Sequence, residues 1–294
     1  MNATTEKNSV QKPLPVRVYS SSGSGFGILS TFKDLFKGFS TAHSLGFRFA
    51  ERSIRTRYRQ SLLGILWAFL PPLATSLIWI ILNKSNIITI GDVGVPYPLF
   101  VITGTVIWSI FSNAVLAPMQ VMQTNKSILV KINFQKESLI FNAFYEILFN
   151  TLISLAIIFV FMIIFKVPIT FHSLLFLPAL ILLIVLGMSI GLLLVPFSFL
   201  FKDIQFALPT ILQFFMYLTP VVYAQASLVG GGQILKLNPV SPVLTSARSW
   251  LLDLHTVAPL YQFELIAVCS LFLLMLGIFL QKITMQIIIE RMGS

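Results

Sequence analysis

The sequence predicts an all-α membrane protein. We expect six transmembrane helices, an amphipathic interfacial helix before them, and short re-entrant helices between the fifth and sixth spans. Hydrophobic residues make up 56% of the 294 residues and charged residues only 10%, whereas a soluble domain carries about 25% charged residues. Apolar segments long enough to cross a hydrocarbon core of roughly 30 Å recur along the chain. Basic residues gather in the connections that would share one side of the membrane.

Residues 1–41 are polar and mixed, and they contain Pro13, Pro15 and a run of serine and glycine at 21–27. This segment lacks the apolar core of a signal peptide, so we expect a flexible cytoplasmic tail that is not cleaved. Its glycines follow no predicted strand, which favours a linker over a phosphate-binding loop.

Residues 42–60 are expected to form the amphipathic interfacial helix. Arginines recur there at spacings of four, three and four, which places them on one stripe of a helix. They are Arg48, Arg52, Arg55 and Arg59. An adjoining apolar edge consists of Phe47, Ile54, Tyr58 and Leu62. A helix of this kind lies at the headgroup boundary, with its rings in the membrane and its arginines facing phosphate.

Residues 61–283 are predicted to hold the six-span transmembrane domain, and residues 284–294 a cytoplasmic C-terminal tail. The expected spans are Ser61–Leu82, Tyr97–Ala117, Ser138–Phe165, Ser173–Leu200, Phe206–Tyr223 and Leu260–Leu280. Prolines at 71 and 72 in the first span, and at 209 and 220 in the fifth, remove backbone donors. We therefore expect these two helices to be kinked.

The distribution of lysine and arginine sets the expected orientation. With six spans both termini share a side, and sixteen basic residues lie on that side against four on the other. This asymmetry places both termini in the cytoplasm. Residues 228–254 then lie on the outer side, with a glycine run and apolar stretches too short to cross. Because such backbone must be satisfied by protein or by water, we expect two short helices that dip into the outer mouth of a pore.

Several classes of function find no support in the residues. The chain has no Walker motif for ATP, and its three histidines are far apart, so no catalytic or metal site and no cofactor of its own is predicted. The net charge of +10 is explained by membrane topology rather than by nucleic acid. The single cysteine, Cys269, has no partner and is expected to be a buried small hydrophobe.

Two carboxylates, Glu146 and Glu264, fall inside predicted spans. An ionisable group inside a membrane suggests a function such as a proton relay. The alternative is that each lies near an interface, where it is hydrated or hydrogen-bonded, and we favour this interpretation while leaving their role open.

Short motifs along residues 45–290 resemble the permease subunits of ABC exporters for O-antigen, capsule and teichoic acid. They begin with RYRQSLLG at 57–64, followed by Leu66-Trp67-Ala68 and Pro72-Leu73. The later ones are Lys131-Ile132 with Phe134 and Lys136-Glu137, Phe201-Lys202-Asp203, Leu212-Gln213, Leu218-Thr219-Pro220, and Leu237-Asn238-Pro239 with Pro242 and Arg248. The chain departs from the family pattern at Val130, Asn133 and Gln135.

This resemblance implies a homodimer that works with two copies of a separate cytoplasmic ABC ATPase, which uses ATP and Mg. The chain itself would be a transporter permease of the bacterial inner membrane and not an enzyme. Its expected cargo is a lipid-linked polysaccharide, above all O-antigen on undecaprenyl diphosphate, moved to the periplasm. Alternatives are export of capsule, teichoic acid, a drug or a small lipid. A proton-coupled secondary carrier and a membrane-embedded transferase are rivals from other classes.

Three groups of residues are candidates for function. The diphosphate of the lipid carrier is assigned to Arg52, Arg55, Arg57, Arg59 and Gly64, although these arginines could instead only anchor the helix to anionic lipids. The polymer path is assigned to Trp67, Phe69, Phe214, Phe215, Tyr217 and Tyr223, although such rings also suit lipid-facing packing. ATPase docking is assigned to residues 120–137, with an apolar anchor between lysines. Its members are Ile128, Leu129, Lys131, Ile132 and Lys136.

Overall fold

The computed structural model describes residues 28–59, 62, 64–87, 93–132, 134–224, 238–254 and 257–293, with side chains from Ala42 onward except 286–287 and 289–294. These residues form helices and turns and no strand, which confirms the all-helical class. The chain divides into a unit of residues 1–39 and a larger unit of residues 40–294. The contacts and sites described below belong to the larger unit. Residues 1–27 of the expected tail at 1–41 lie outside the described residues.

Four helices are long and apolar enough to cross a membrane. They are α3 (Tyr97–Thr124), α5 (Ser138–Ile164), the pair η2 (Phe171–Leu175) and α6 (Phe176–Leu200), and α10 (Leu260–Gly293) as far as Met285. These helices coincide with the second, third, fourth and sixth predicted spans. The protein is therefore an integral membrane protein.

The first and fifth predicted spans are shorter helices. Helix α2 covers Leu70–Lys84 and α7 covers Asp203–Tyr217, 15 residues each, or about 22 Å at 1.5 Å per residue. This length is below the roughly 30 Å of a hydrocarbon core, so the count of six spans stays a prediction.

The predicted kink in the first span is wrong. Pro71 and Pro72 occupy the first positions of α2, which follows a short 3₁₀ turn, η1 (Gly64–Ala68). Proline is well tolerated there because the first helical N–H groups have no acceptor in the helix. In the fifth span Pro209 lies inside α7, whereas Pro220 follows the end of that helix.

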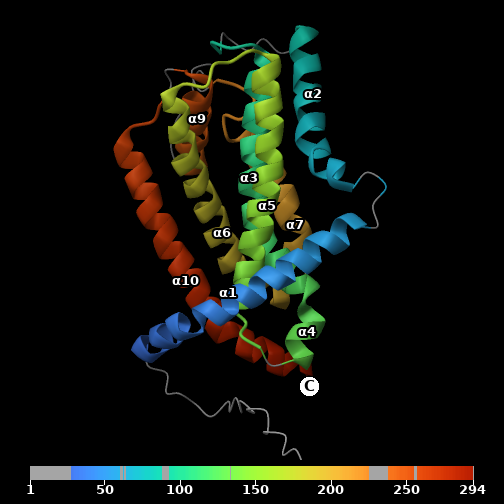
Figure 1. Ribbon diagram of the computed structural model, residues 1–294, viewed down its shortest axis with the longest axis vertical. Helices are drawn as coiled ribbons and strands as arrows, with labels where there is room; N and C mark the ends of the chain where they lie inside the picture. Colours follow the sequence, from blue (N-terminus) through green and yellow to red (C-terminus); the bar gives the residue numbers. More distant parts are fainter. Residues whose placement is uncertain are drawn as a thin grey trace, which may run out of the picture. The chain divides into compact units, whose positions relative to one another are not determined.

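Helix α3 is the centre of the larger unit and contacts α2, α5, α6, α7 and α9 (Figure 1). In its most apolar 18-residue window 78% of the residues are buried, against 17% for α10. A helix that is apolar all round belongs in a protein interior or in lipid. Helix α3 therefore lies in the interior of the described fold, and α10 lies at its surface. Cys269 lies on α10 and is exposed, so the expectation of a buried thiol is wrong.

Helix α9 (Val240–Leu252) lies in the segment predicted to contain re-entrant helices. Its 13 residues are almost all buried, and it contacts α3, α6 and η2. At about 20 Å it is too short to cross a membrane. The other expected helix of that segment falls on residues 225–237, which lie outside the described residues.

Two helices extend beyond the predicted boundaries. Helix α1 covers Ile28–Arg59 and so begins well before residue 42. Helix α10 continues to Gly293, through most of the segment expected to be a tail. Between α3 and α5, the short helix α4 (Lys126–Lys131) contacts both α3 and α10.

Candidate functional site

Helix α1 crosses α5 near the end of the molecule where α4 lies (Figure 1). The crossing is tight because small residues of α1 face α5. Ala42 and Ala50 are each 1% exposed, and a Cβ on Gly46 would lie 2.5 Å from Phe141 Cβ. We call this contact the α1–α5 junction.

Two polar contacts connect the helices at this junction. Arg57 Nη2 donates a hydrogen bond to Glu146 Oε2, and the two groups form an ion pair. The preceding residue of α5, Tyr145, forms a hydrogen bond through its hydroxyl with Nε2 of His43. Arg57 therefore faces α5, on the opposite side of α1 from the arginine stripe. Glu146 is buried and paired with Arg57, whereas Glu264 is exposed, and the depth of either carboxylate in the membrane stays a prediction.

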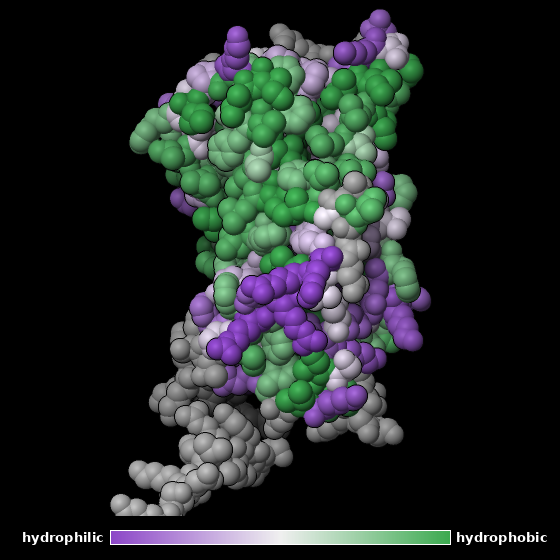
Figure 2. Space-filling model, turned by 45° about the vertical axis from the view of Figure 1, so that its right-hand side comes forward, coloured by the Kyte–Doolittle hydropathy of each residue, from purple (hydrophilic) through white to green (hydrophobic). Residues whose placement is uncertain are grey.

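The arginine stripe remains on the open face of α1. Arg48, Arg52, Arg55 and Arg59 are all exposed or half-buried. Arg55 Nη2 donates to Glu51 Oε1 at 2.6 Å, one turn earlier on the same helix. Arg52 and Arg59 form no ion pair with any described side chain. Figure 2 shows a diagonal band of hydrophilic residues below a broad hydrophobic surface, the arrangement expected of a cationic face at a headgroup boundary.

Gly64 marks the turn between α1 and α2. Its φ angle is +52°, in the left-handed region that glycine adopts without steric cost. No described heavy atom outside its immediate neighbours lies within 4 Å of the position where a Cβ would stand. The backbone turn therefore explains glycine here, and the space in front of it is open.

The aromatic residues assigned to the polymer path divide into two groups. Tyr217 at the end of α7 contacts Trp79 of α2, with ring centroids 6.1 Å apart. Tyr223 donates its hydroxyl hydrogen bond to the backbone oxygen of Tyr217 at 3.0 Å. Trp67 and Phe214 are also exposed, and Phe69 is half-buried. These rings lie on the α2 and α7 side of α3.

Phe215 points into the protein instead. Its ring centroid lies 6.3 Å from that of Trp108 on α3, and Trp108 in turn lies 5.3 Å from Phe111. Trp108 is buried and was not singled out from the sequence, because a tryptophan in the middle of an apolar span carries no local sign of its partner.

Near α9, at the opposite end of α3 from α4, a buried arginine connects three segments. Arg248 is 3% exposed. Its Nη1 donates a hydrogen bond to the Val221 carbonyl at 2.8 Å, and its Nη2 donates one to the Pro220 carbonyl at 3.0 Å. The guanidinium carbon lies 3.6 Å from the centre of the Phe100 ring. Burial lowers the pKa of the Arg248 guanidinium to about 9, so the group remains charged at neutral pH. We call this group of residues the Arg248 cluster.

Two neighbouring contacts belong to the same cluster. Asn238 Nδ2 donates to Thr219 Oγ1 at 2.8 Å, and its Oδ1 accepts from the Val240 N–H at 3.0 Å. Gly104 of α3 permits this arrangement, since a Cβ there would lie 2.2 Å from the Val221 carbonyl oxygen. Thr219, Pro220, Asn238 and Arg248, which belong to motifs noted in the sequence without a role, thus meet in space.

The predicted ATPase-docking segment has one member turned inward. Leu129 of α4 is 3% exposed and belongs to the hydrophobic core. It therefore attaches α4 to the core of this chain. Ile132 is 58% exposed, Val130 and Lys131 are also exposed, and Ile128 and Lys136 are half-buried.

The fold and these sites define the protein as a helical integral membrane protein in which helix α1 lies across the end of a buried central span. The chain belongs to the ABC-2 type transporter family, whose model matches residues 47–252. It is also similar to the O-antigen export system permease protein RfbA of Myxococcus xanthus, with 25% identity over 206 residues, 68% of this chain and 76% of that protein. The resemblance to polysaccharide-export ABC permeases is thereby confirmed.

Proposed function

We propose that this chain forms the membrane channel of an ATP-driven exporter that moves lipid-linked polysaccharide from the cytoplasm to the periplasm. O-antigen on undecaprenyl diphosphate is the proposed cargo. The similarity to the Myxococcus xanthus O-antigen export permease carries this proposal. Placement in the bacterial inner membrane with both termini in the cytoplasm is supported by the sixteen-to-four distribution of basic residues.

The proposed complex is a homodimer with two copies of an ABC ATPase, since permeases of this family work with such a partner. Helix α4 is the proposed docking element. Its exposed residues Val130, Lys131 and Ile132 combine apolar and basic groups on one short segment, which suits a helix seated in the groove of a partner. ATP and Mg would bind to the ATPase and not to this chain.

We assign the diphosphate of the lipid carrier to Arg52 and Arg59. Arginine can bind phosphate oxygens through two parallel N–H groups, and these two side chains have no carboxylate partner among the described residues. Arg57 is held by Glu146, and Arg55 by Glu51. The open space in front of Gly64 lies at the end of the same helix.

Reconstitution tests the function as a whole. The chain and its ABC ATPase are placed in liposomes that contain lipid-linked O-antigen, and the appearance of polymer at the opposite face is measured with and without ATP. We expect movement only with ATP and a hydrolysis-competent ATPase. Movement driven by a proton gradient without the ATPase would contradict the proposal in favour of a carrier. Chemical change of the glycan by the purified chain alone would favour a transferase.

Charge-preserving variants test the diphosphate assignment. The double change Arg52→Lys with Arg59→Lys keeps the charge but removes the planar fork, so we expect export to fall about tenfold while membrane insertion stays normal. The control is Arg48→Lys, on the same stripe but outside the assigned pair. Export at the parental rate by the double lysine variant would show that the two arginines only anchor the helix.

The polymer path is assigned to the aromatic rings on the α2 and α7 side of α3. Single cysteines along α7, in a Cys269→Ser background, are exposed to an aqueous thiol reagent. We expect labelling on the face that carries Phe214 and Tyr217. Equal protection around the whole helix would exclude α7 from the path.

A further inference from the structure

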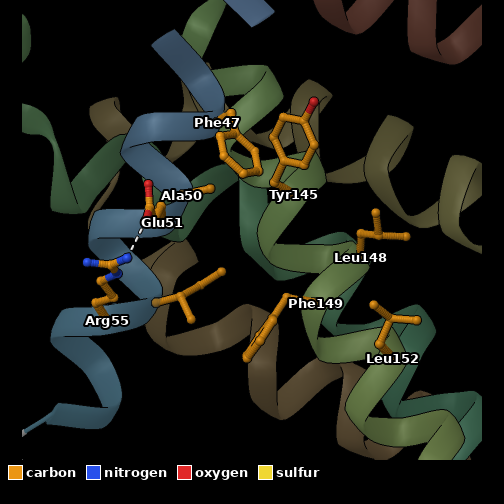
Figure 3. Close-up of a pocket in the computed structure, with 9 residues that line it drawn as sticks. Phe47, Ala50, Glu51, Arg55, Tyr145, Leu148, Phe149 and Leu152 are labelled. Carbon is orange, nitrogen blue, oxygen red and sulfur yellow. Dashed lines mark hydrogen bonds and ion pairs between the residues drawn. The ribbon is translucent and has the colours of Figure 1, made fainter. Parts of the chain in front are cut away.

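The α1–α5 junction contains a groove of about 350 Å³. This volume falls at the lower end of the range typical of small-molecule sites, roughly 300 to 1,000 Å³. Helix α1 forms one wall and α5 the other. Phe47, Tyr145 and Phe149 lie between the two helices, whereas Arg55 lies at the outer edge of α1 and Leu152 at the outer edge of α5 (Figure 3). The groove is lined by Phe47, Ala50, Glu51, Ile54, Arg55, Tyr145, Leu148, Phe149 and Leu152.

The walls of the groove suit an apolar chain. Its lining is mainly aliphatic and aromatic, and three of these side chains stay substantially exposed: Phe47 at 52%, Leu148 at 41% and Leu152 at 60%. Helix α5 is one of the four helices long and apolar enough to cross a membrane. Acyl chains that surround such a helix can reach the exposed residues of the groove.

The rim of the groove carries one positive and one negative group. Arg55 and Glu51 form an ion pair of 2.6 Å, with side chains 77% and 44% exposed. A guanidinium has five N–H donors and a carboxylate has two acceptor oxygens, so both groups keep hydrogen-bonding capacity on their exposed sides. A pair of this kind is complementary to a headgroup that contains a phosphate and a primary ammonium a short distance apart.

We propose that the groove is a binding site for phosphatidylethanolamine of the surrounding bilayer. One acyl chain lies between Ile54 and Leu152, the phosphate contacts Arg55, and the ammonium contacts Glu51. An anionic headgroup would leave Glu51 facing a second negative charge. The same repulsion disfavours a diphosphate, which we assign to Arg52 and Arg59, neighbours of Arg55 on the arginine stripe. The lipid site uses Arg55 and Glu51, which are not in the proposed cargo site, and does not depend on it.

Lipid retention by the full-length protein tests the headgroup. The purified protein in detergent is titrated with phosphatidylethanolamine, phosphatidylcholine or phosphatidylglycerol of matched chains, and bound lipid is counted by native mass spectrometry. We expect phosphatidylethanolamine to bind at least fivefold more tightly than the other two lipids. Phosphatidylcholine tests the ammonium, because its methylated nitrogen has no N–H to donate to Glu51.

Variants of Glu51 and Arg55 test which part of the lipid headgroup each side chain contacts. Glu51→Gln should remove the preference for phosphatidylethanolamine, and Arg55→Gln should weaken the binding of all three lipids. The matched control is Arg59→Gln, an exposed arginine of the same helix that does not line the groove, and it should bind like the parent. Equal binding of the three lipids by the parent protein, or an unchanged preference in Glu51→Gln, would overturn the proposal.

Filling the groove tests its position. Leu148→Trp should reduce phosphatidylethanolamine binding about tenfold, whereas Val160→Trp, an exposed residue of α5 outside the groove, should not. Leu152→Trp provides a second filling variant if the first lowers the unfolding temperature. Binding that survives both filling variants would place the lipid elsewhere. Displacement of phosphatidylethanolamine by undecaprenyl phosphate at equal concentration would show that the carrier is the occupant, and would also overturn the proposal.

Discussion

Two arginines at different ends of the protein are held by different kinds of partner. Arg57, at the α1–α5 junction, meets the carboxylate of Glu146 and keeps a side chain that is 42% exposed. Arg248, on α9, is 3% exposed and contacts two backbone carbonyls and the face of Phe100, and it forms no ion pair with any described carboxylate. The first contact joins two side chains, whereas the second fixes the backbone.

This difference bears on what each arginine can do. An ion pair between side chains can open and reform while the backbone stays in place, and solvent weakens it. A buried arginine that satisfies carbonyls at the end of α7 cannot leave without exposing those carbonyls to an apolar environment. We therefore expect the Arg248 cluster to determine stability and the α1–α5 junction to permit movement. Three experiments test this comparison, and a fourth extends it to the exposed side of α4.

The largest loss of stability is expected for Arg248→Ala. The change removes two hydrogen bonds from a charged donor and a cation–π contact, a loss of about 4 kcal/mol in unfolding free energy. Thermal unfolding in detergent, followed by fluorescence-detected size exclusion, measures it. Arg59→Ala is the control, since that exposed arginine has no described ion-pair partner. A shift no larger than that of the control would show that the Arg248 cluster does not hold the segment after α7.

A smaller loss is expected for Gly104→Ala. The new Cβ would meet the Val221 carbonyl oxygen at 2.2 Å, and overpacking of this kind costs about 1 to 3 kcal/mol. Gly46→Ala at the α1–α5 junction would meet Phe141 Cβ at 2.5 Å. We expect Gly46→Ala to displace α1 with a smaller shift of the unfolding temperature. Equal shifts for the two variants would mean that both contacts are equally rigid.

The Arg57–Glu146 pair should contribute less still. A double-mutant cycle with Arg57→Gln and Glu146→Gln should give a coupling energy of about 1 to 2 kcal/mol, because one partner is buried and the other partly hydrated. Chemical unfolding in mixed detergent measures each corner of the cycle, and added salt should lower the coupling. Additive effects of the two changes would show that the ion pair does not couple the helices.

The smallest effect on stability is expected on the exposed side of α4. Lys131→Glu with Ile132→Asp should change the unfolding free energy by no more than about 0.5 kcal/mol, yet release the ABC ATPase in a co-purification assay. The control is Leu129→Asp, which buries a charge in the core and should unfold the segment. Retained co-purification by the double variant would move the docking site away from α4.

The sequence was sufficient for the parts of the fold that depend on uniform apolar composition. The spans containing α3, α5, α6 and α10 were predicted because each is long, apolar and bounded by polar residues. The two prolines at the start of α2 were misinterpreted, since an adjacent pair fits either a kink or a first turn. Cys269 was misplaced for a related reason, because an apolar segment can face lipid as well as a core.

The candidate sites were less accessible to prediction. The spacing of Arg48, Arg52, Arg55 and Arg59 identified an exposed stripe, but no local pattern shows that Arg57 meets Glu146, which is 89 residues away. Leu129 could not be assigned inward or outward, because a helix of six residues has too few turns to show a periodicity. The motifs of the Arg248 cluster were noted, yet only the folded chain brings their carbonyls to one guanidinium.

The two contacts of α5 with α1 have a mechanical consequence. Consecutive residues of α5, Tyr145 and Glu146, reach His43 and Arg57, which are separated by about 21 Å along the axis of α1. While both contacts are formed, α1 from Ala42 to Arg59 cannot rotate relative to α5 about either contact alone. We expect a tilt of α5 to reorient this part of α1 together with Arg52 and Arg59, and opening of the Arg57–Glu146 pair to release it.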